Sequence, residues 1–129
     1  MRDRRLATAR SLILFAIAAI GVVSVGACRK AHARPVQGGD ADRGEVAIRD
    51  YGCGSCHTIS GVAGANGQVG PPLSNFGERG MIAGYVPNTT DFLIRWIEVP
   101  RAIKPRTDMP NLAVPESDAR DIAAYLYSH

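Results

Sequence analysis

Aromatic residues are scarce in this chain: they make up 6% of its 129 residues, and only one of them is a tryptophan. Cysteine and methionine are also rare, with three of each. The length allows one domain but not two ordinary ones. A domain so poor in aromatic side chains gains a sizeable core most easily by burying a large apolar group that is not part of the chain.

Net charge is absent outside the N-terminal segment. The formal charge of +3 arises within residues 1–27, which hold four arginines and a single aspartate. The rest of the chain has equal numbers of acidic and basic residues. Because the excess positive charge belongs to the N-terminal segment, it gives no argument for nucleic acid as a partner.

Residues 1–27 have the layout of a secretory signal. A basic stretch over residues 1–10 precedes an apolar run over residues 12–27, an order that is typical of exported proteins. The run is shorter than the ~20 apolar residues that a membrane span needs. We therefore expect residues 1–27 to act as a leader for export.

The end of this leader has three interpretations. Residues 25–28 (VGAC) resemble a bacterial lipobox, whose cysteine becomes the lipidated N-terminus, with valine where leucine is usual. Cleavage after residues 31–33 (AHA) would discard Cys28 and release a soluble domain, and an uncleaved leader would itself be the anchor. We favour lipidation of Cys28, because it explains an odd cysteine in an exported protein. It predicts a lipid-anchored protein at the periplasmic side of the bacterial membrane.

The remaining chain divides into a tether and one domain. Residues 28–39 are polar and contain Pro35 and two glycines, a composition that predicts a tether. Residues 40–129 contain no repeat and no convincing strand pattern. We predict that they form a single all-α domain.

Helical periodicity and capping residues indicate three helices, over residues 40–50, 91–99 and 116–128. Asp40 or Asp42 is expected to cap the first helix, and Asp91 the second, which Pro100 should end. The segments over residues 61–72 and 101–115 are rich in glycine or proline and are predicted to be irregular. Short helices joined by long loops make a poor core unless something large fills the centre.

Residues 53–57 read Cys-Gly-Ser-Cys-His, the attachment signature of c-type haem. Two thiols three positions apart on one turn can form thioethers with the two vinyl groups of a single porphyrin. The histidine that follows is then placed beneath the iron as its proximal ligand. The sequence therefore predicts one haem c, attached through Cys53 and Cys56, with His57 on the metal.

Other sites use some of the same residues. A thioredoxin-like dithiol has the C-x-x-C spacing but belongs to a βαβ unit, which this chain lacks. A structural zinc site needs four ligands, and the sequence offers no second Cys/His pair. A disulfide between Cys53 and Cys56 would suit an exported protein but leaves His57 without a role.

A second axial ligand is expected from methionine. Met109 lies in a proline-rich loop directly before Pro110, and a stiff loop holds a soft thioether on iron against competing water. Met81 lies where core packing or a loop explains it equally well. His32 and His129 are expected to be solvated surface residues. The favoured ligand is Met109.

Together these motifs resemble the class I c-type cytochromes over residues 40–129. The matching pieces are the CGSCH run, GPPL at residues 70–73, TDMP at 107–110 and AAYL at 123–126. The resemblance implies a small cytochrome c fold of three to five short helices, with long loops around one haem. It also implies that the first and last helices cross, with Gly44 against Tyr125 or Leu126.

The same resemblance carries further residue roles. The Pro71 carbonyl oxygen would accept a hydrogen bond from His57 Nδ1, which fixes the ring and raises its basicity. Tyr85 and Trp96 would hydrogen-bond a haem propionate, with core packing as the alternative for Trp96. The pattern also resembles the haem domains attached to haem–copper oxidases, although no copper-binding motif is present.

One-electron transfer is the function that this resemblance implies. His/Met ligation fills both axial positions, which disfavours a haem peroxidase or a ligand sensor. The expected partners are a respiratory or dehydrogenase donor and an oxidase or reductase acceptor, with the protein as a monomer at the membrane surface. The alternative is an integral electron-transfer subunit of a larger respiratory complex.

Overall fold

Helices make up nearly all the regular structure of residues 34–129, which are the residues that the computed structural model describes. In chain order the elements are α2 (Ala41–Asp50), the 3-10 turns η1 (Cys53–Ser55) and η2 (Phe76–Glu78), β1 (Met81–Ile82), β2 (Val86–Pro87), α3 (Thr90–Glu98), α4 (Pro100–Ile103) and α5 (Glu116–Ser128). The predicted all-α class is confirmed. No helix within residues 34–129 has both the length and the hydropathy to cross a membrane. The leader at 1–27 and Cys28 lie outside the described residues.

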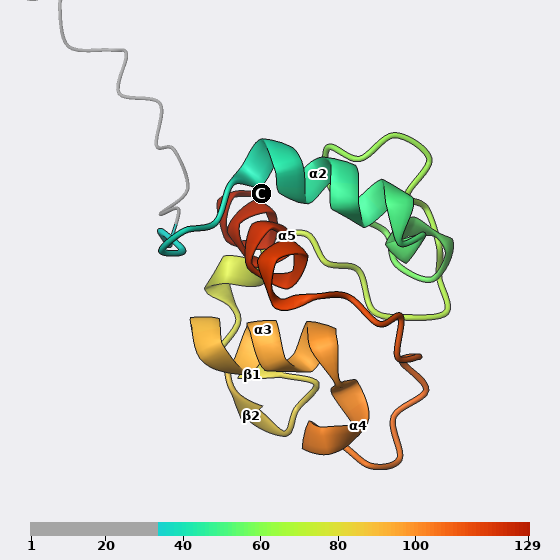
Figure 1. The fold of residues 1–129 in the computed structure, drawn as a ribbon. Coiled ribbons are helices and arrows are strands. Elements are labelled where there is room, and N and C mark those ends of the chain that lie inside the picture. The colour runs from blue at the N-terminus through green and yellow to red at the C-terminus, as the bar shows by residue number, and fades with distance from the viewer. Residues whose placement is uncertain (1–33) are drawn as a thin grey trace, which may run out of the picture. The chain divides into compact units, whose positions relative to one another are not determined.

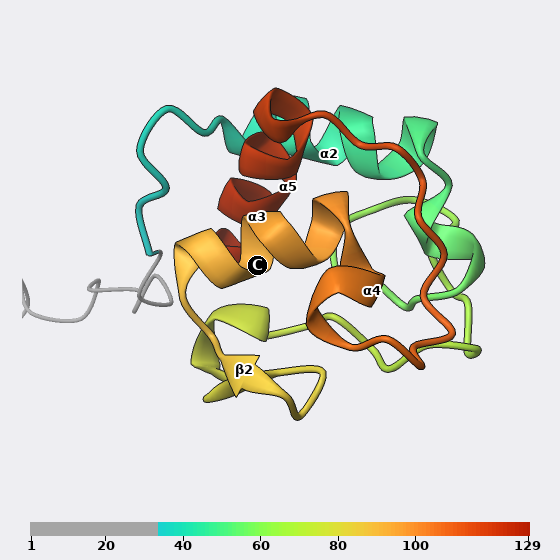
Figure 2. The same cartoon turned by 60° about the horizontal axis from the view of Figure 1, so that its bottom comes forward.

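The core forms where α5 lies between α2 and α3 (Figures 1 and 2). Ile48 of α2 and Leu93 of α3 are each 1% exposed. The apolar face predicted for α5 is buried in the same cluster, through Ala119, Ile122, Ala123 and Leu126. Each helix therefore buries one apolar face against a neighbour, which is the main source of its stability.

Helices α2 and α5 cross at Gly44, as the resemblance implies. Gly44 is buried, and a Cβ atom there would overlap the Asp121 carbonyl oxygen and lie 3.0 Å from the Tyr125 Cβ. Only glycine allows the two backbones to approach this closely. Tyr125 and Leu126 were the two residues expected opposite Gly44, and the structure places Tyr125 there.

The caps of α2 and α3 differ in how well the sequence predicts them. Asp40 caps α2 and accepts a hydrogen bond from the Arg43 backbone N–H at 2.9 Å. Thr89, not Asp91, caps α3, and Asp91 lies in the first turn, where its charge favours the helix dipole. The prediction of Asp91 as the cap is wrong because Thr89 offers a cap oxygen two residues earlier.

The segment that begins at Pro100 starts with a helical turn, where an irregular loop was expected from residue 101. Pro100 is the first residue of α4, a single turn that ends at Ile103. Proline suits this position because the first residues of a helix have no intrahelical partner for their N–H groups. The predicted loop over residues 101–115 therefore begins at Lys104.

A short antiparallel pair, β1 and β2, was not predicted. Met81 pairs with Pro87 and Ile82 with Val86. Ala83, Gly84 and Tyr85 connect the strands. Ala83 and Gly84 have φ angles of 52° and 67°, and the Tyr85 N–H donates to the Ile82 carbonyl oxygen at 2.9 Å, which closes a tight turn. Two residues per strand are too few for an alternating pattern to appear in the sequence.

Residues 34–39, predicted as the end of the tether, pack on the domain. We call this segment the N-terminal strap. Val36 is buried in the core cluster, and the Gln37 carbonyl oxygen accepts a hydrogen bond from Arg120 at 3.2 Å. Arg34 donates to the Asn88 carbonyl oxygen at 2.8 Å. The prediction of a tether that reaches residue 39 is therefore wrong for the strap.

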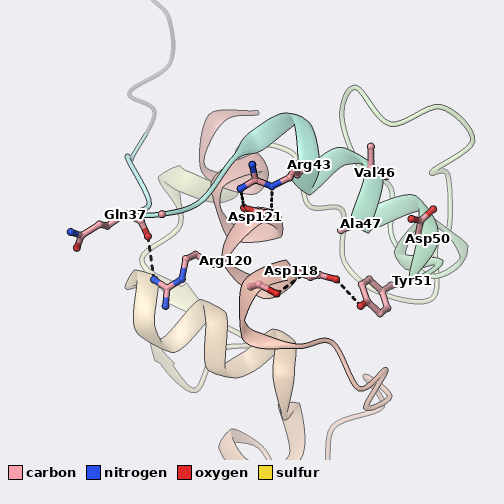
Figure 3. A pocket seen from close by; sticks show the side chains of 11 residues that line it. Gln37, Arg43, Val46, Ala47, Asp50, Tyr51, Asp118, Arg120 and Asp121 are labelled. Atoms are coloured by element: carbon pink, nitrogen blue, oxygen red, sulfur yellow. Dashed lines mark hydrogen bonds and ion pairs between the residues drawn. The ribbon is translucent and has the colours of Figure 1, made fainter.

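Asp121 and Arg43 link the crossing helices beside a surface hollow of about 750 Å³ (Figure 3). The Asp121 carboxylate accepts hydrogen bonds from Arg43 Nε at 2.7 Å, from Arg43 Nη2 at 3.0 Å and from the Asp40 backbone N–H at 2.8 Å. Asp121 is buried. The hydrogen bonds from Arg43 hold the pKa of this carboxyl below its ordinary value.

We expect Asp121→Asn to lower the free energy of unfolding at neutral pH. Because the pKa of Asp121 is lower in the folded chain, the carboxylate stabilises the fold above about pH 4, and this contribution is lost as the pH falls through the folded-state pKa. Urea titrations at several pH values should show wild type and variant converging in acid. A stability difference that stays constant into strong acid would contradict this prediction.

The control for this experiment is Glu45→Gln. Glu45 forms an exposed ion pair with Arg49 one turn along α2, and such pairs contribute little to stability. The control variant should therefore follow the wild-type stability closely across the same pH range.

Candidate functional site

The Cys-x-x-C-H run forms a tight turn directly after α2. Gly52 has a φ of 68° and leads into η1, and the backbone N–H groups of Cys56 and His57 both donate to the Cys53 carbonyl oxygen, at 3.2 and 3.0 Å. Just before the turn, the Tyr51 hydroxyl donates to Asp118 at 2.8 Å. This bond ties the residue just before the turn to α5. The spacing of the motif therefore places both cysteines and the histidine on one rigid turn.

The two cysteines carry half-buried free thiols. Burial raises the pKa of the Cys53 thiol, whereas redox-active and metal-binding thiols have a lowered pKa. The described residues contain no group of three or more His, Cys, Asp or Glu side chains placed to hold a metal ion. These observations disfavour a reactive dithiol, and they leave both thiols free to form thioethers.

His57 is held by one hydrogen bond. Its Nδ1 lies 2.7 Å from the Pro71 carbonyl oxygen, as the resemblance implies. This contact puts the ring proton on Nδ1, because a carbonyl oxygen can only accept. Nε2 has no hydrogen-bond partner among residues 34–129, so its lone pair is available to a metal.

Gly70 provides the space that the His57 ring occupies. A Cβ atom on Gly70 would lie 2.6 Å from His57 Nδ1 and 2.9 Å from Nε2, and real Cβ atoms do not come so close to a neighbouring ring. The Gly70 backbone N–H donates to the Cys56 carbonyl oxygen at 2.7 Å. The GPPL run is part of the predicted signature, but the role of its glycine was not recognised from the sequence.

The loop that carries Pro71 is bound to the haem-attachment turn at several points. The Thr58 hydroxyl donates to the Gly67 carbonyl oxygen at 3.0 Å, and the Leu73 N–H donates to the Thr58 carbonyl oxygen at 2.8 Å. The Gly67 N–H donates to the Gly54 carbonyl oxygen at 3.0 Å. These bonds hold the Pro71 carbonyl in place for His57.

Met109 lies in the loop between α4 and α5. Both views place this loop on the same side of the domain as residues 53–72 (Figures 1 and 2). Met109 is half-buried, and its backbone N–H donates to the Thr107 hydroxyl at 3.2 Å. Met81 lies on β1 with 47% of its surface exposed. The placement of the two methionines favours Met109 over Met81 as a ligand.

Tyr85 and Trp96 are not brought together by a hydrogen bond within residues 34–129. Tyr85 lies in the hairpin turn, is 58% exposed and has the Lys104 ammonium 5.9 Å from the centre of its ring. Trp96 is half-buried and packs against the core cluster. Core packing, the alternative role for Trp96, is compatible with this position, and the hydrogen bonds of Tyr85 and Trp96 to a haem propionate stay a prediction.

The donor set fits a covalently bound haem. Two adjacent thiols, an imidazole with a free Nε2 and a half-buried thioether are the groups such a cofactor requires. Apolar side chains that the protein leaves exposed include Val69 beside the GPPL run and Leu112 in the loop after Met109.

Comparisons with known proteins agree with this chemistry. The cytochrome c family matches residues 41–129. Over 89 residues the chain is 36% identical to cytochrome c oxidase subunit 2 of Alkalihalophilus pseudofirmus and 29% identical to that of Bacillus subtilis. These matches cover 68% and 67% of this chain but only 25% of each relative, so the chain corresponds to about a quarter of their length. The attachment turn, the helices and these matches together show that the chain belongs to the cytochrome c family. It is a haem electron-transfer protein whose haem c is attached through Cys53 and Cys56.

Proposed function

We propose that this protein is a His/Met-ligated monohaem cytochrome that passes single electrons at the outer face of a bacterial membrane. The observation that carries the proposal is the 2.7 Å contact between His57 Nδ1 and the Pro71 carbonyl oxygen, which prepares Nε2 as an iron ligand. When bound, haem supplies a one-electron ferric/ferrous couple. The chain would supply the two axial donors and their orientation.

Each axial donor has its own support. The Pro71 carbonyl keeps the proton of His57 on Nδ1 and increases electron donation from Nε2. Thr107 and Pro110 restrict the backbone on either side of Met109, which keeps its thioether available. If both residues bind the iron, no coordination position would remain open, which would favour electron transfer over a peroxidase or a sensor.

The proposed location depends on Cys28. If Cys28 is the lipidated N-terminus, five residues lie between it and Arg34, whose side chain contacts Asn88. The six steps from Cys28 to Arg34 reach at most about 20 Å. The domain would therefore stay close to the membrane surface, which raises its effective concentration near membrane-bound partners. The partners we propose are a quinol- or dehydrogenase-linked donor and an oxidase or reductase acceptor.

A fixed subunit of a respiratory complex is the second candidate. The relatives above are named as cytochrome c oxidase subunit 2, and this favours it. In that case the domain would deliver electrons within one assembly rather than diffuse between partners.

Membrane fractionation of Cys28→Ser separates these candidates. For a lipid-tethered carrier, we expect haem-stained protein to move from the membrane fraction to the soluble periplasmic fraction, while intact mass shows a diacylglyceryl group on wild-type Cys28 only. A variant that remains bound to an oxidase in mild detergent would favour the subunit. Soluble wild type that begins at Arg34 would contradict the lipid anchor.

A further inference from the structure

Asn88 is a buried polar residue between β2 and α3, with an exposed fraction of 7%. Its side-chain nitrogen donates to the carbonyl oxygens of Phe76 and Arg79, both at 2.9 Å. Its side-chain oxygen accepts from the Tyr127 hydroxyl at 2.8 Å. The amide therefore joins α5 to η2 and the residue that follows it, and its geometry depends on every one of these partners.

Arg79 extends this network toward the attachment turn. While its carbonyl oxygen is held by Asn88, its guanidinium donates to the carbonyl oxygens of Pro72 and, at 3.3 Å, of Ser74. The guanidinium also lies 5.1 Å from the centre of the Phe76 ring. Asn88 thus fixes the backbone from which the Arg79 side chain clamps residues 72–74.

The clamped segment continues directly into the partner of His57. Pro72 follows Pro71, whose carbonyl oxygen lies 2.7 Å from His57 Nδ1. A connected series of hydrogen bonds therefore runs from Tyr127 through Asn88 and Arg79 to the loop that orients the imidazole. The series is buried where Asn88 meets Phe76 and Tyr127 and reaches the surface at Pro72. Its buried part holds one arrangement tightly while all its members are satisfied.

We propose that Asn88 is a positioning residue for His57: through Arg79 it holds the Pro71 carbonyl against Nδ1 and so adjusts the reduction potential of the haem. The inference rests on the proposed axial role of His57. A strong bond at Nδ1 makes the imidazole a better donor and stabilises the ferric state, which lowers the potential. A slackened loop should weaken this bond and raise the potential.

The test compares Asn88→Ala and Tyr127→Phe with wild-type holoprotein. For Asn88→Ala we expect about a threefold shift of the ferric/ferrous ratio toward ferrous at a fixed ambient potential, which is about 30 mV at 59 mV per tenfold change. Solvent exchange of the His57 Nδ1 proton, followed by NMR of histidine-labelled protein, should become about tenfold faster as the hydrogen bond opens. Tyr127→Phe, which loses one hydroxyl, should change both quantities in the same direction but less.

Asp121→Asn is the matched control, because it destabilises the helix crossing without touching the network. It should lower stability and leave the potential and the Nδ1 exchange rate unchanged. If both network variants lower stability but move neither quantity, Asn88 is only structural and the proposal is overturned. If Asn88→Ala does not fold, Tyr127→Phe alone decides. Wild type without paramagnetically shifted His57 signals would show instead that the axial assignment has failed, and the proposed function with it.

Discussion

Replacing Met109 with alanine is expected to remove the weak red absorption band of the oxidised protein while the haem stays covalently attached. The substitution deletes the thioether and leaves the Cys53, Cys56 and His57 attachment intact. Because axial ligands shift haem potentials over about 0.8 V, we expect the midpoint potential to fall by more than about 100 mV. Optical redox titration on membranes, with imidazole added to detect an open coordination position, measures both effects.

Met81→Ala is the matched control for this experiment. Met81 is a second methionine within the described domain, and 47% of its surface is exposed on β1, so its loss should leave the red band and the potential unchanged. If the band survives in Met109→Ala and disappears in Met81→Ala, the assignment of the second ligand is reversed. If the oxidised wild type lacks the band, the iron has no methionine ligand.

Gly70→Ala is expected to have the second largest effect. The added Cβ would lie 2.6 Å from His57 Nδ1, so either the ring or the Pro71 loop must move. Overpacking of this kind costs about 1–3 kcal/mol, and the movement also breaks the hydrogen bond to Pro71. We expect a lower yield of holoprotein, a lower urea midpoint and loss of the protected Nδ1 proton in NMR spectra.

Gly80→Ala supplies the control, because no atom lies within 4 Å of a Cβ built on Gly80. It should leave the stability of holoprotein unchanged or raise it by less than about 1 kcal/mol, through a less flexible unfolded chain. If Gly70→Ala and Gly80→Ala changed the stability of holoprotein equally, contact of the added Cβ with the His57 ring would not be the cause of the loss.

Local patterns account for the parts of the fold that were predicted. The apolar spacing of residues 119–126 predicts α5, and Asp40 marks the beginning of α2. The attachment turn was predicted because its chemistry requires residues only three and four positions apart. Helix periodicity, caps and a contiguous motif are all properties of neighbouring residues, and a single sequence contains them.

The features that were not predicted depend on partners far along the chain. Asn88 and Tyr127 are 39 residues apart, and Arg34 meets the Asn88 carbonyl oxygen across 54 residues. No spacing rule links such pairs, so the hydrogen bonds of Asn88 and the strap appear only in the folded chain. The α4 turn is hidden for a different reason: Pro100 follows α3 and also begins the next turn, whereas a proline after a helical run indicates only the end of a helix.

The strap decides where a shortened version of this protein should start. Helix propensity alone places the first residue at Asp40, but such a truncation would remove the buried Val36 side chain. It would also remove Arg34, whose guanidinium lies 5.4 Å from the centre of the Tyr127 ring. A recombinant domain that keeps Arg34 retains these contacts, and a signal sequence for periplasmic haem attachment can be fused directly ahead of it.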